Sequence, residues 1–425
     1  ARIEKADLSL IQKFIPDIVK EQGLTVKGSA TADVNFTGLL SKAQDAKISA
    51  SAKLSDVNIE SKKLNQSAGP INGLVEYRSP VLSWKDLSVK YQGKTWTSHG
   101  SMEDFVNPII SATVEAENLT ANVEAKKKDD KIQLTSLSGS WFDSTYEFIG
   151  DIFIPAGKAP NIDMNAEFKL SLRDLPKMLP PRQAKQIEAL KLAGILKIKA
   201  RAKGIPQEWQ NLVSTASVET PALYMLGYQV ADLNISAKQK DGAVNPLIIT
   251  GKLYGGDLNA TTTVSLKEEK FPFTTGAKIE NTSLELLKKD TPLKQQQLSG
   301  LVNMTADLKG ELLDIRKMQG TATMKISNGY LWSLEILSNV LSIISSTFQG
   351  GDIVISEGEA TLTFDGGRVT THDLALKGNT VTLLGEGWID WDRNIDFNIS
   401  PKLEPQPGGN TTLNAIAVLN PTAGV

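Results

Sequence analysis

The chain has 425 residues, of which 40% are hydrophobic and 22% charged, a composition typical of an ordered protein and not of a disordered one. The formal net charge is −2, which argues against a nucleic-acid partner because such binding draws on an excess of Lys and Arg. Cys is absent, which excludes disulfides, thiolate metal sites and a cysteine nucleophile.

The chain begins Ala1-Arg2-Ile3, without an initiator Met or a signal region, so a mature form or an excised fragment is expected. A first helix is predicted where Leu8, Ile11, Ile15 and Ile18 fall at helical spacing, with Asp7 as its N-cap. An anchor in the membrane would lie upstream of this helix.

Through most of the remaining chain, apolar side chains occupy every second position, the pattern of half-buried β-strands. Clear stretches cover residues 110–116, 162–170, 258–266, 362–364 and 395–399. Turn sequences such as Asp241-Gly242 and Asn328-Gly329 separate the strands. The pattern predicts a mainly β, antiparallel fold.

Three segments repeat one pattern, in which a helix-like stretch precedes a ten-residue strand bounded by two glycines. The glycine pairs are Gly28 and Gly38, Gly194 and Gly204, and Gly300 and Gly310. The stretches before the second and third strands begin at Asp174-Leu175 and Ser283-Leu284. We therefore predict three modules, each a short amphipathic helix with a β-meander: 1–170, 171–280 and 281–425. The third module also carries a helical pattern over residues 331–348. Because Glu335 and Asn339 interrupt its apolar residues, we do not expect it to span a membrane.

Each strand predicts one apolar and one polar face, and the apolar face needs a cover. Two readings stay open: two sheets that close over a packed core, or an elongated, repeat-built sheet curled into an open apolar groove, a β-taco, whose lining a ligand covers. Few helices and few large aromatic residues at inward positions favour the groove. The predicted lining residues are Val34, Phe36, Leu196, Ile198, Val302, Met304, Leu374, Leu376 and Leu383. Each could equally be an ordinary core residue.

The opposite face is predicted to be charged, as in the stripe Lys197, Lys199, Arg201 and Lys203. We read this stripe as an outer strand face in water, with contact to anionic lipid headgroups as the second reading.

Residues able to carry chemistry are scarce. The two histidines, His99 and His372, lie far apart in the sequence at polar strand positions. Glu357, Glu359, Asp373 and Glu386 could pair as the carboxylates of a glycosidase do, but β-rich proteins commonly offer such pairs. We therefore expect no catalytic residues, no metal site and no cofactor.

The last module resembles the C-terminal region of AsmA-like proteins, and the repeated helix and Gly-to-Gly strand resemble the upstream repeats of that family. The resemblance rests on Asn328-Gly329-Tyr330-Leu331, Glu335-Ile336-Leu337, residues 364–369, Asp373-Leu374-Ala375-Leu376-Lys377-Gly378 and residues 384–390. It implies a periplasmic protein of a diderm bacterium, tethered to the inner membrane by an upstream anchor. It further implies a lipid-lined β groove that moves phospholipid between the inner and outer membranes without catalysis.

Phospholipid acyl chains, the inner membrane and an outer-membrane component are thus the expected partners. The alternative function is a structural or assembly factor for outer-membrane biogenesis, with a closed, dry β core and exposed strand edges that recruit partner strands.

Overall fold

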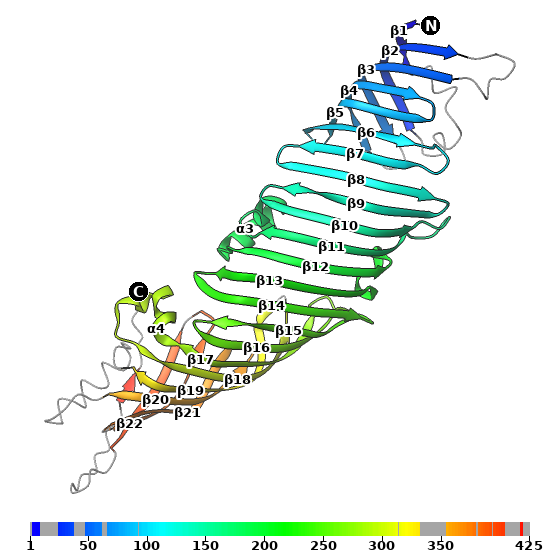
Figure 1. Cartoon of the computed structure of the whole chain (residues 1–425). Coiled ribbons are helices and arrows are strands. Elements are labelled where there is room, and N and C mark those ends of the chain that lie inside the picture. The colour runs from blue at the N-terminus through cyan, green and yellow to red at the C-terminus, as the bar shows by residue number, and fades with distance from the viewer. Residues whose placement is uncertain are drawn as a thin grey trace. The chain divides into compact units, whose positions relative to one another are not determined.

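Strands that follow one another in the chain lie side by side and pair antiparallel (Figure 1). The computed structural model describes residues 2–8, 24–37, 47–61, 66–91, 93–312, 314–331, 354–379, 381–392, 394–403 and 417–419. The chain divides into two units: unit 1 comprises residues 1–170 and 201–207, and unit 2 comprises residues 171–200 and 208–425. The module boundaries predicted near residues 171 and 281 stay predictions.

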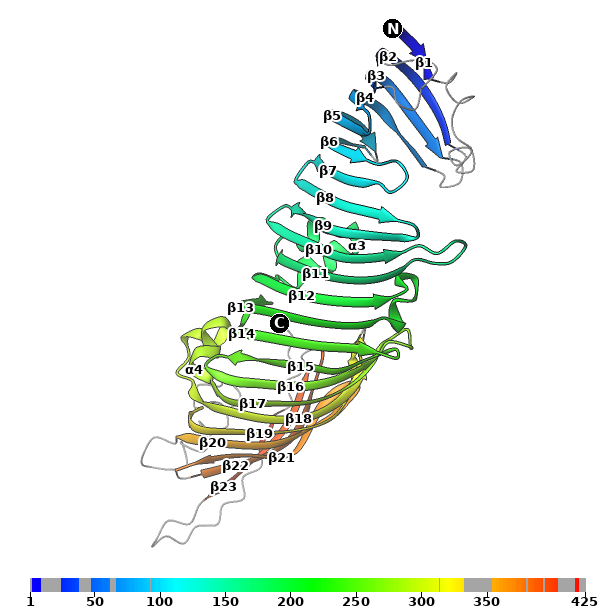
Figure 2. The same cartoon turned by 45° about the vertical axis from the view of Figure 1, so that its right-hand side comes forward.

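Unit 1 is a meander in which each strand from β1 to β10 pairs with the next. Its strands are β1 (Arg2–Asp7), β2 (Leu24–Thr37), β3 (Lys47–Ser61), β4 (Gln66–Arg78), β5 (Val81–Tyr91), β6 (Lys94–Glu103), β7 (Ile109–Ala116), β8 (Leu119–Lys128), β9 (Lys131–Trp141), β10 (Ser144–Phe153) and β11 (Asn161–Ser171). The loop between β10 and β11 projects beyond the strand ends (Figure 2).

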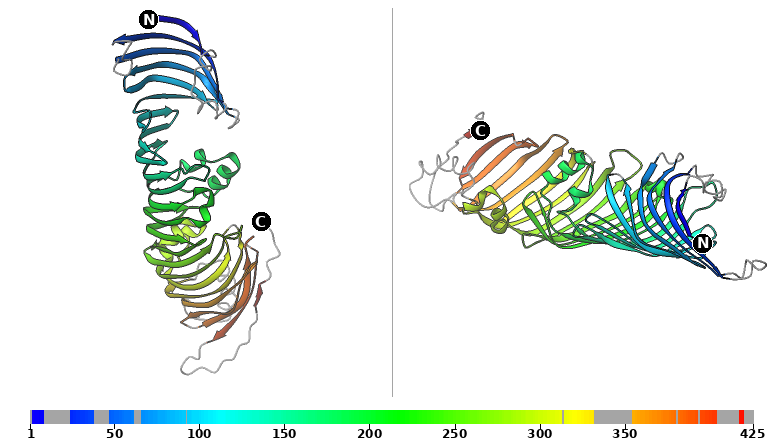
Figure 3. Two further views of the ribbon diagram at one scale, coloured as in Figure 1. Left: turned by 90° about the vertical axis from the view of Figure 1, so that its right-hand side faces the viewer. Right: turned by 90° about the horizontal axis from the view of Figure 1, so that it is seen from above.

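Unit 2 repeats the same plan, and each strand from β13 to β23 pairs with the next. The strand β12 (Ile195–Gly204) is divided between the units after Ala200. The other strands are β13 (Val213–Met225), β14 (Tyr228–Lys240), β15 (Ala243–Leu253), β16 (Gly256–Ser265), β17 (Pro272–Ser283), β18 (Ser299–Glu311), β19 (Asp314–Tyr330), β20 (Ile355–Asp365), β21 (Arg368–Gly378), β22 (Val381–Asp390), β23 (Ile395–Leu403) and β24 (Ala417–Leu419). Several of these strands are visibly curved (Figure 3).

Among the residues that the structure describes, the helices are short and lie at strand ends. They are α2 (Leu175–Met178), α3 (Pro181–Ala189), α4 (Leu284–Leu287) and the 3₁₀ turns η3 (Pro206–Asn211), η4 (Lys288–Asp290) and η5 (Pro292–Gln295). Helices thus begin directly after Asp174 and Ser283, as the repeat predicts, and the Ser283 side chain caps α4 by accepting a hydrogen bond from the Leu286 N–H. The predicted fold class, mainly β with an open antiparallel sheet and few short helices, is confirmed.

Two further helix predictions fall largely outside the described residues. Asp7, predicted as an N-cap, is the last residue of β1, and the helical pattern that follows it lies outside the described residues after Leu8. Of the helix predicted over 331–348, only Leu331 is described, and it is buried. In the part of the chain that the structure covers, no helix is both long and apolar enough to cross a membrane.

β-Bulges interrupt many of the strand pairs, and an Asp or Asn in the left-handed conformation marks several of them. Asp56 (φ 52°) lies where the register of β3 and β4 shifts, and Asn328 (φ 52°) where that of β18 and β19 shifts. Asp and Asn tolerate this conformation better than most residues. Because a bulge bends its strand and increases the local twist, these bulges account for the curvature of the strands.

The first glycine of a repeat lies opposite such a bulge. A Cβ on Gly28 would stand 2.6 Å from the Val57 Cα, next to Asp56, and a Cβ on Gly300 would stand 2.9 Å from the Gly329 Cα, next to Asn328. Both glycines also have φ near 130°, which is essentially restricted to glycine. The repeated glycine is thus required by the bulge on the neighbouring strand.

We expect Gly300→Ala to lower the free energy of unfolding by about 1–3 kcal/mol, because alanine would be strained at this φ and would press on the adjacent backbone. Gly276→Ala is the matched control in the same unit, since an added Cβ there would meet only the Asp307 Oδ1 at 3.4 Å. Urea denaturation of both variants checks the prediction, and equal stabilities would contradict it.

Candidate functional site

One face of unit 1 carries a continuous row of apolar side chains and glycine, one residue from each strand from β2 to β11. Paired residues connect the row across every strand pair. This apolar row of unit 1 consists of Ala32, Ala52, Val75, Trp84, Gly100, Ala112, Val123, Leu137, Phe148 and Ala166. Nine steps of about 4.8 Å between neighbouring strands give it a length of about 43 Å.

Every member of this row is half-buried, and none is fully covered. Among the described residues of unit 1, the fully buried hydrophobic side chains are Ala30, Val57, Ile71 and Leu134. A packed core of this size would bury far more of its apolar residues. Unit 1 therefore presents a long apolar path that its described residues leave partly uncovered.

Two aromatic residues along this path, Trp84 on β5 and Tyr146 on β10, have their polar atoms satisfied. The Trp84 Nε1–H donates to the Ser98 Oγ (2.9 Å), and the Tyr146 hydroxyl donates to the Thr120 carbonyl (2.9 Å). Burial raises the pKa of the Tyr146 hydroxyl, so it stays protonated. Phe148 and Phe168 meet edge to face with ring centroids 5.3 Å apart. These rings offer apolar surface without an unpaired donor, whereas the buried Nε1–H of Trp96 on β6 has no hydrogen-bond partner among the described residues.

Unit 2 carries an equivalent row from β13 to β20, built on the same pairing. This apolar row of unit 2 consists of Val218, Ile235, Ile249, Ala260, Ala277, Ala306, Ala322 and Leu362. Its members on β13 to β17 and Leu362 on β20 are half-buried, whereas Ala306 and Ala322 are buried. The path is thus most covered at β18 and β19.

The strand ends beyond this row carry a packed cluster. It consists of Leu298, Leu331, Ile355, Leu376, Val381, Leu383 and Ile399, with Leu284, Ile326, Leu374 and Phe397 packed against it. Leu284 belongs to α4, so the short helix covers this part of the sheet. Here the apolar side chains cover one another, as in an ordinary protein core.

The residues predicted to line a groove occupy different environments. Val34, Leu196, Ile198, Val302 and Met304 are half-buried, and Phe36 is exposed near the end of β2. Val302 and Met304 lie together, opposite Ile326 and Met324 of β19. Leu374, Leu376 and Leu383 come together in the packed cluster. Contact of all nine residues with lipid stays a prediction.

The prediction omitted much of the half-buried path, including Val75, Trp84, Leu137, Phe148 and Ile249. The same alternation runs through their strands, so the signal was present. What the sequence lacks is the register that aligns these residues with one another from strand to strand.

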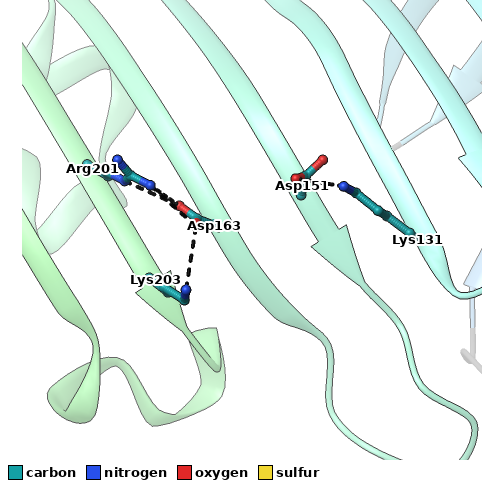
Figure 4. Close-up of polar contacts among 5 residues, drawn as sticks. All are labelled: Lys131, Asp151, Asp163, Arg201 and Lys203. Atoms are coloured by element: carbon teal, nitrogen blue, oxygen red, sulfur yellow. Dashed lines mark hydrogen bonds and ion pairs between the residues drawn. The ribbon is translucent and has the colours of Figure 1, made fainter.

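The opposite face is polar and charged. In unit 1 the Asp163 carboxylate lies 3.1 Å from the Arg201 Nη2 and 3.8 Å from the Lys203 Nζ, and Lys131 lies 2.9 Å from Asp151 (Figure 4). Lys197 and Lys199 are exposed as well. Ion pairs this exposed add little stability, so their main effect is to keep this face in water.

An open hollow of about 570 Å³ lies over β17 to β21 and is lined in part by the polar row Lys278, Thr305, Thr323 and Thr361. Glu359 lies in it, 3.2 Å from the Lys325 Nζ and 3.5 Å from the Lys377 Nζ. The hydrogen bond from Lys325, together with both positive charges, lowers the pKa of Glu359. A general acid needs the opposite shift, so this carboxylate is poorly suited to protonating a leaving group.

The remaining candidates for chemistry are scattered or exposed. His372 lies 3.9 Å from Glu386, with both side chains largely in solvent, and His99 is exposed on β6 opposite Thr113. Glu357 is exposed on β20. Within the described ranges, no group of three His, Asp or Glu residues could hold a metal ion.

Asp373 serves the fold. Its carboxylate accepts hydrogen bonds from the Thr361 hydroxyl (2.6 Å) and the Thr361 N–H (2.7 Å), and these bonds, with the hydroxyl as the larger cause, lower the pKa of Asp373. A lowered pKa in the folded state stabilises the fold above the unfolded pKa of about 3.9, and this contribution is lost as the pH falls through the folded pKa.

We therefore expect Asp373→Asn to unfold at a lower urea concentration than the wild type at neutral pH. The difference should shrink as the solution becomes more acidic than the unfolded pKa of the aspartate. Urea midpoints of both proteins across the acid range check this, and a difference that stays constant with pH would contradict it.

Among known protein families, the model of one family matches part of this chain. Residues 217–374, from β13 to β21, match the model of the AsmA family, which confirms the resemblance over this stretch. No curated protein and no solved structure matches the chain. The AsmA family is associated with the bacterial envelope and with lipid-related processes of the outer membrane.

Proposed function

We propose that this chain, an AsmA-like protein over residues 217–374, binds phospholipid acyl chains along its apolar rows and carries phospholipid between the inner and outer membranes. The observation that carries the proposal is the half-buried state of the entire apolar row of unit 1. Contiguous exposed apolar surface is a liability for a protein in water unless it binds something. An acyl chain is the ligand that such a surface suits.

The dimensions support this ligand. A bilayer core of about 30 Å contains two layers of acyl chains, so one chain spans about 15 Å. The row of about 43 Å could therefore hold the tails of more than one lipid. Each methylene removed from water contributes about 0.8 kcal/mol, so a few contacts per tail give useful affinity without a fixed pose.

The proposed transport needs no catalysis. Movement along the rows exchanges similar apolar contacts from strand to strand, and the polar headgroups stay in water beside the strand ends. We place the protein in the periplasm, tethered to the inner membrane by an upstream anchor and meeting a component of the outer membrane. Nucleic acid, metal ions and cofactors have no part in this function.

Native mass spectrometry with lipid extraction tests the proposal on protein purified without detergent. The expected result is phospholipid bound to the folded protein in more than one copy. A protein that is folded and lipid-free, and that takes up no fluorescent phospholipid from vesicles, would overturn the proposal.

The packed cluster at the C-terminal strands favours a second candidate function. A sheet that fills its own apolar face, as the packed cluster does around Leu376 and Leu383, suits a structural or assembly factor for the outer membrane. The same experiment separates the two functions, because an assembly factor would be stable and empty.

A further inference from the structure

The turn between β13 and β14 exposes a run of large apolar side chains. Tyr224, Met225, Leu226 and Tyr228 are all exposed, with 47% of Met225 and 53% of Leu226 accessible to solvent. Single exposed hydrophobic residues are common on protein surfaces, but four within five positions form a local apolar tip.

The residues of this tip are not those that its type of turn favours. Leu226 and Gly227 form the turn with φ values of 54° and 92°, and a two-residue turn with positive φ prefers Asn or Asp before glycine. Leucine at this position has an unfavourable backbone conformation and an exposed side chain. The turn itself therefore does not require leucine at this position.

Backbone hydrogen bonds attach the tip to a neighbouring segment of the chain. The Tyr224 N–H donates to the Ala193 carbonyl (2.8 Å), the Ala193 N–H donates to the Tyr224 carbonyl (3.1 Å), and the Leu226 N–H donates to the Leu190 carbonyl (2.8 Å). These bonds join the tip to the segment that directly follows α3. The helix α3 lies on the same side of the sheet's strand ends as the β13–β14 turn (Figure 1). The apolar side chains therefore project from a fixed position.

The supporting segment is basic. Residues 171–193 contain five cations, Arg173, Lys177, Arg182, Lys185 and Lys191, and two carboxylates, Asp174 and Glu188. Asp174 is buried and bonded to Lys177 (2.9 Å), whereas Arg173, Arg182, Lys185 and Lys191 are exposed. Lys191 lies between Leu190 and Ala193, the residues bonded to the tip, and so places one exposed positive charge next to it, while Glu188 is exposed at the end of α3.

We propose that the β13–β14 turn and α3 together form a contact with the surface of a bilayer that contains anionic phospholipid. Tyrosines lie at the headgroup level of membranes, with aliphatic side chains below them, and each nearby Lys or Arg is attracted to anionic headgroups. This proposal deepens the proposed function and rests on it. It gives the β13–β14 turn as the point where the strand ends meet a membrane to exchange phospholipid.

Vesicle flotation tests the contact on the full chain, with vesicles of phosphatidylcholine alone or of phosphatidylcholine and phosphatidylglycerol in equal amounts. We expect binding to the anionic vesicles that weakens as salt is added. The variant Met225→Ser/Leu226→Asn should bind about tenfold more weakly, because two half-exposed apolar side chains are lost. Lys185→Gln/Lys191→Gln should lose most of its preference for phosphatidylglycerol.

Leu226→Asn suits the turn and should leave the fold intact. Leu312→Asn is the matched control, because Leu312 has the same 53% exposure at another turn of unit 2, where Glu311 pairs with Lys270 and Lys317. This control should bind vesicles as the wild type does.

Equal vesicle binding by the tip variant and the wild type would overturn the proposal, as would equal losses in the tip and control variants. A dimer that the tip variant abolishes would also overturn it and would identify a second copy as the occupant. Lipid extraction keeps the two proposals apart: the tip variant should still contain bound phospholipid, whereas failure of the proposed function would leave the wild type itself empty.

Discussion

Met304→Asp is expected to remove the phospholipid bound over β18 of unit 2 from a protein that still folds. Met304 is half-buried on β18, with Ile279 on one side and Met324 on the other. In the lipid-free protein the new carboxylate can remain hydrated. Under acyl chains it would be a buried, unpaired charge that costs several kcal/mol, so we expect phospholipid to bind this part of unit 2 at least tenfold more weakly and the number of bound copies to fall. Native mass spectrometry and lipid extraction measure the effect.

Thr305→Asp is the matched control for this experiment. Thr305 is the next residue on the same strand, but it is exposed on the polar face beside Lys278 and Thr323. The same charge at this position should leave the bound phospholipid unchanged. If both variants keep their lipid, acyl chains do not contact this part of unit 2, and if both lose it, the loss is an effect of charge on the whole protein.

Leu383→Ala is expected to lower the free energy of unfolding by about 2–5 kcal/mol, the range for a leucine deleted from a packed core. Leu383 is 1% exposed and belongs to the packed cluster with Leu376 and Ile399. The methyl groups that are removed would leave a cavity that these neighbours can fill only in part. Chemical denaturation followed by fluorescence measures the change, and the amount of bound phospholipid should stay the same.

Leu384→Ala is the matched control, since Leu384 is the next residue and is 45% exposed. Its stability should change by less than about 0.5 kcal/mol. A Leu383→Ala protein with unchanged stability and less phospholipid would show that Leu383 lines the lipid path, as the sequence predicts, and is not a residue of a closed core.

The alternation of apolar and polar residues was sufficient to predict the strands and their two faces, but not where the alternation changes phase. On β3, Leu54 lies on the apolar face. Strict alternation would put residue 56 next on that face, but the bulge at Asp56 puts Val57 there. The same shift occurs around Asp373, between Thr371 and Leu374. A reading by strict alternation would assign the half-strand beyond each bulge to the wrong face.

The sequence also could not distinguish covered from uncovered apolar residues. Met304 and Leu376 both occupy apolar positions of alternating strands, yet the first is half-buried and the second is buried. The difference arises from residues distant in the sequence, such as Leu298 and Ile355, which pack beside Leu376. Such coverage depends on tertiary packing, which local periodicity does not encode.

Because each strand adds one residue to an apolar row, the reach of a unit is set by its number of hairpins. The β7–β8 hairpin, residues 109–128, adds two strands and therefore about 9.6 Å of row. Loss or duplication of such a hairpin would keep the antiparallel order and the facing of every other strand, whereas loss of one strand would reverse the direction of those that follow. Proteins of this design can thus be lengthened or shortened in steps of about a nanometre.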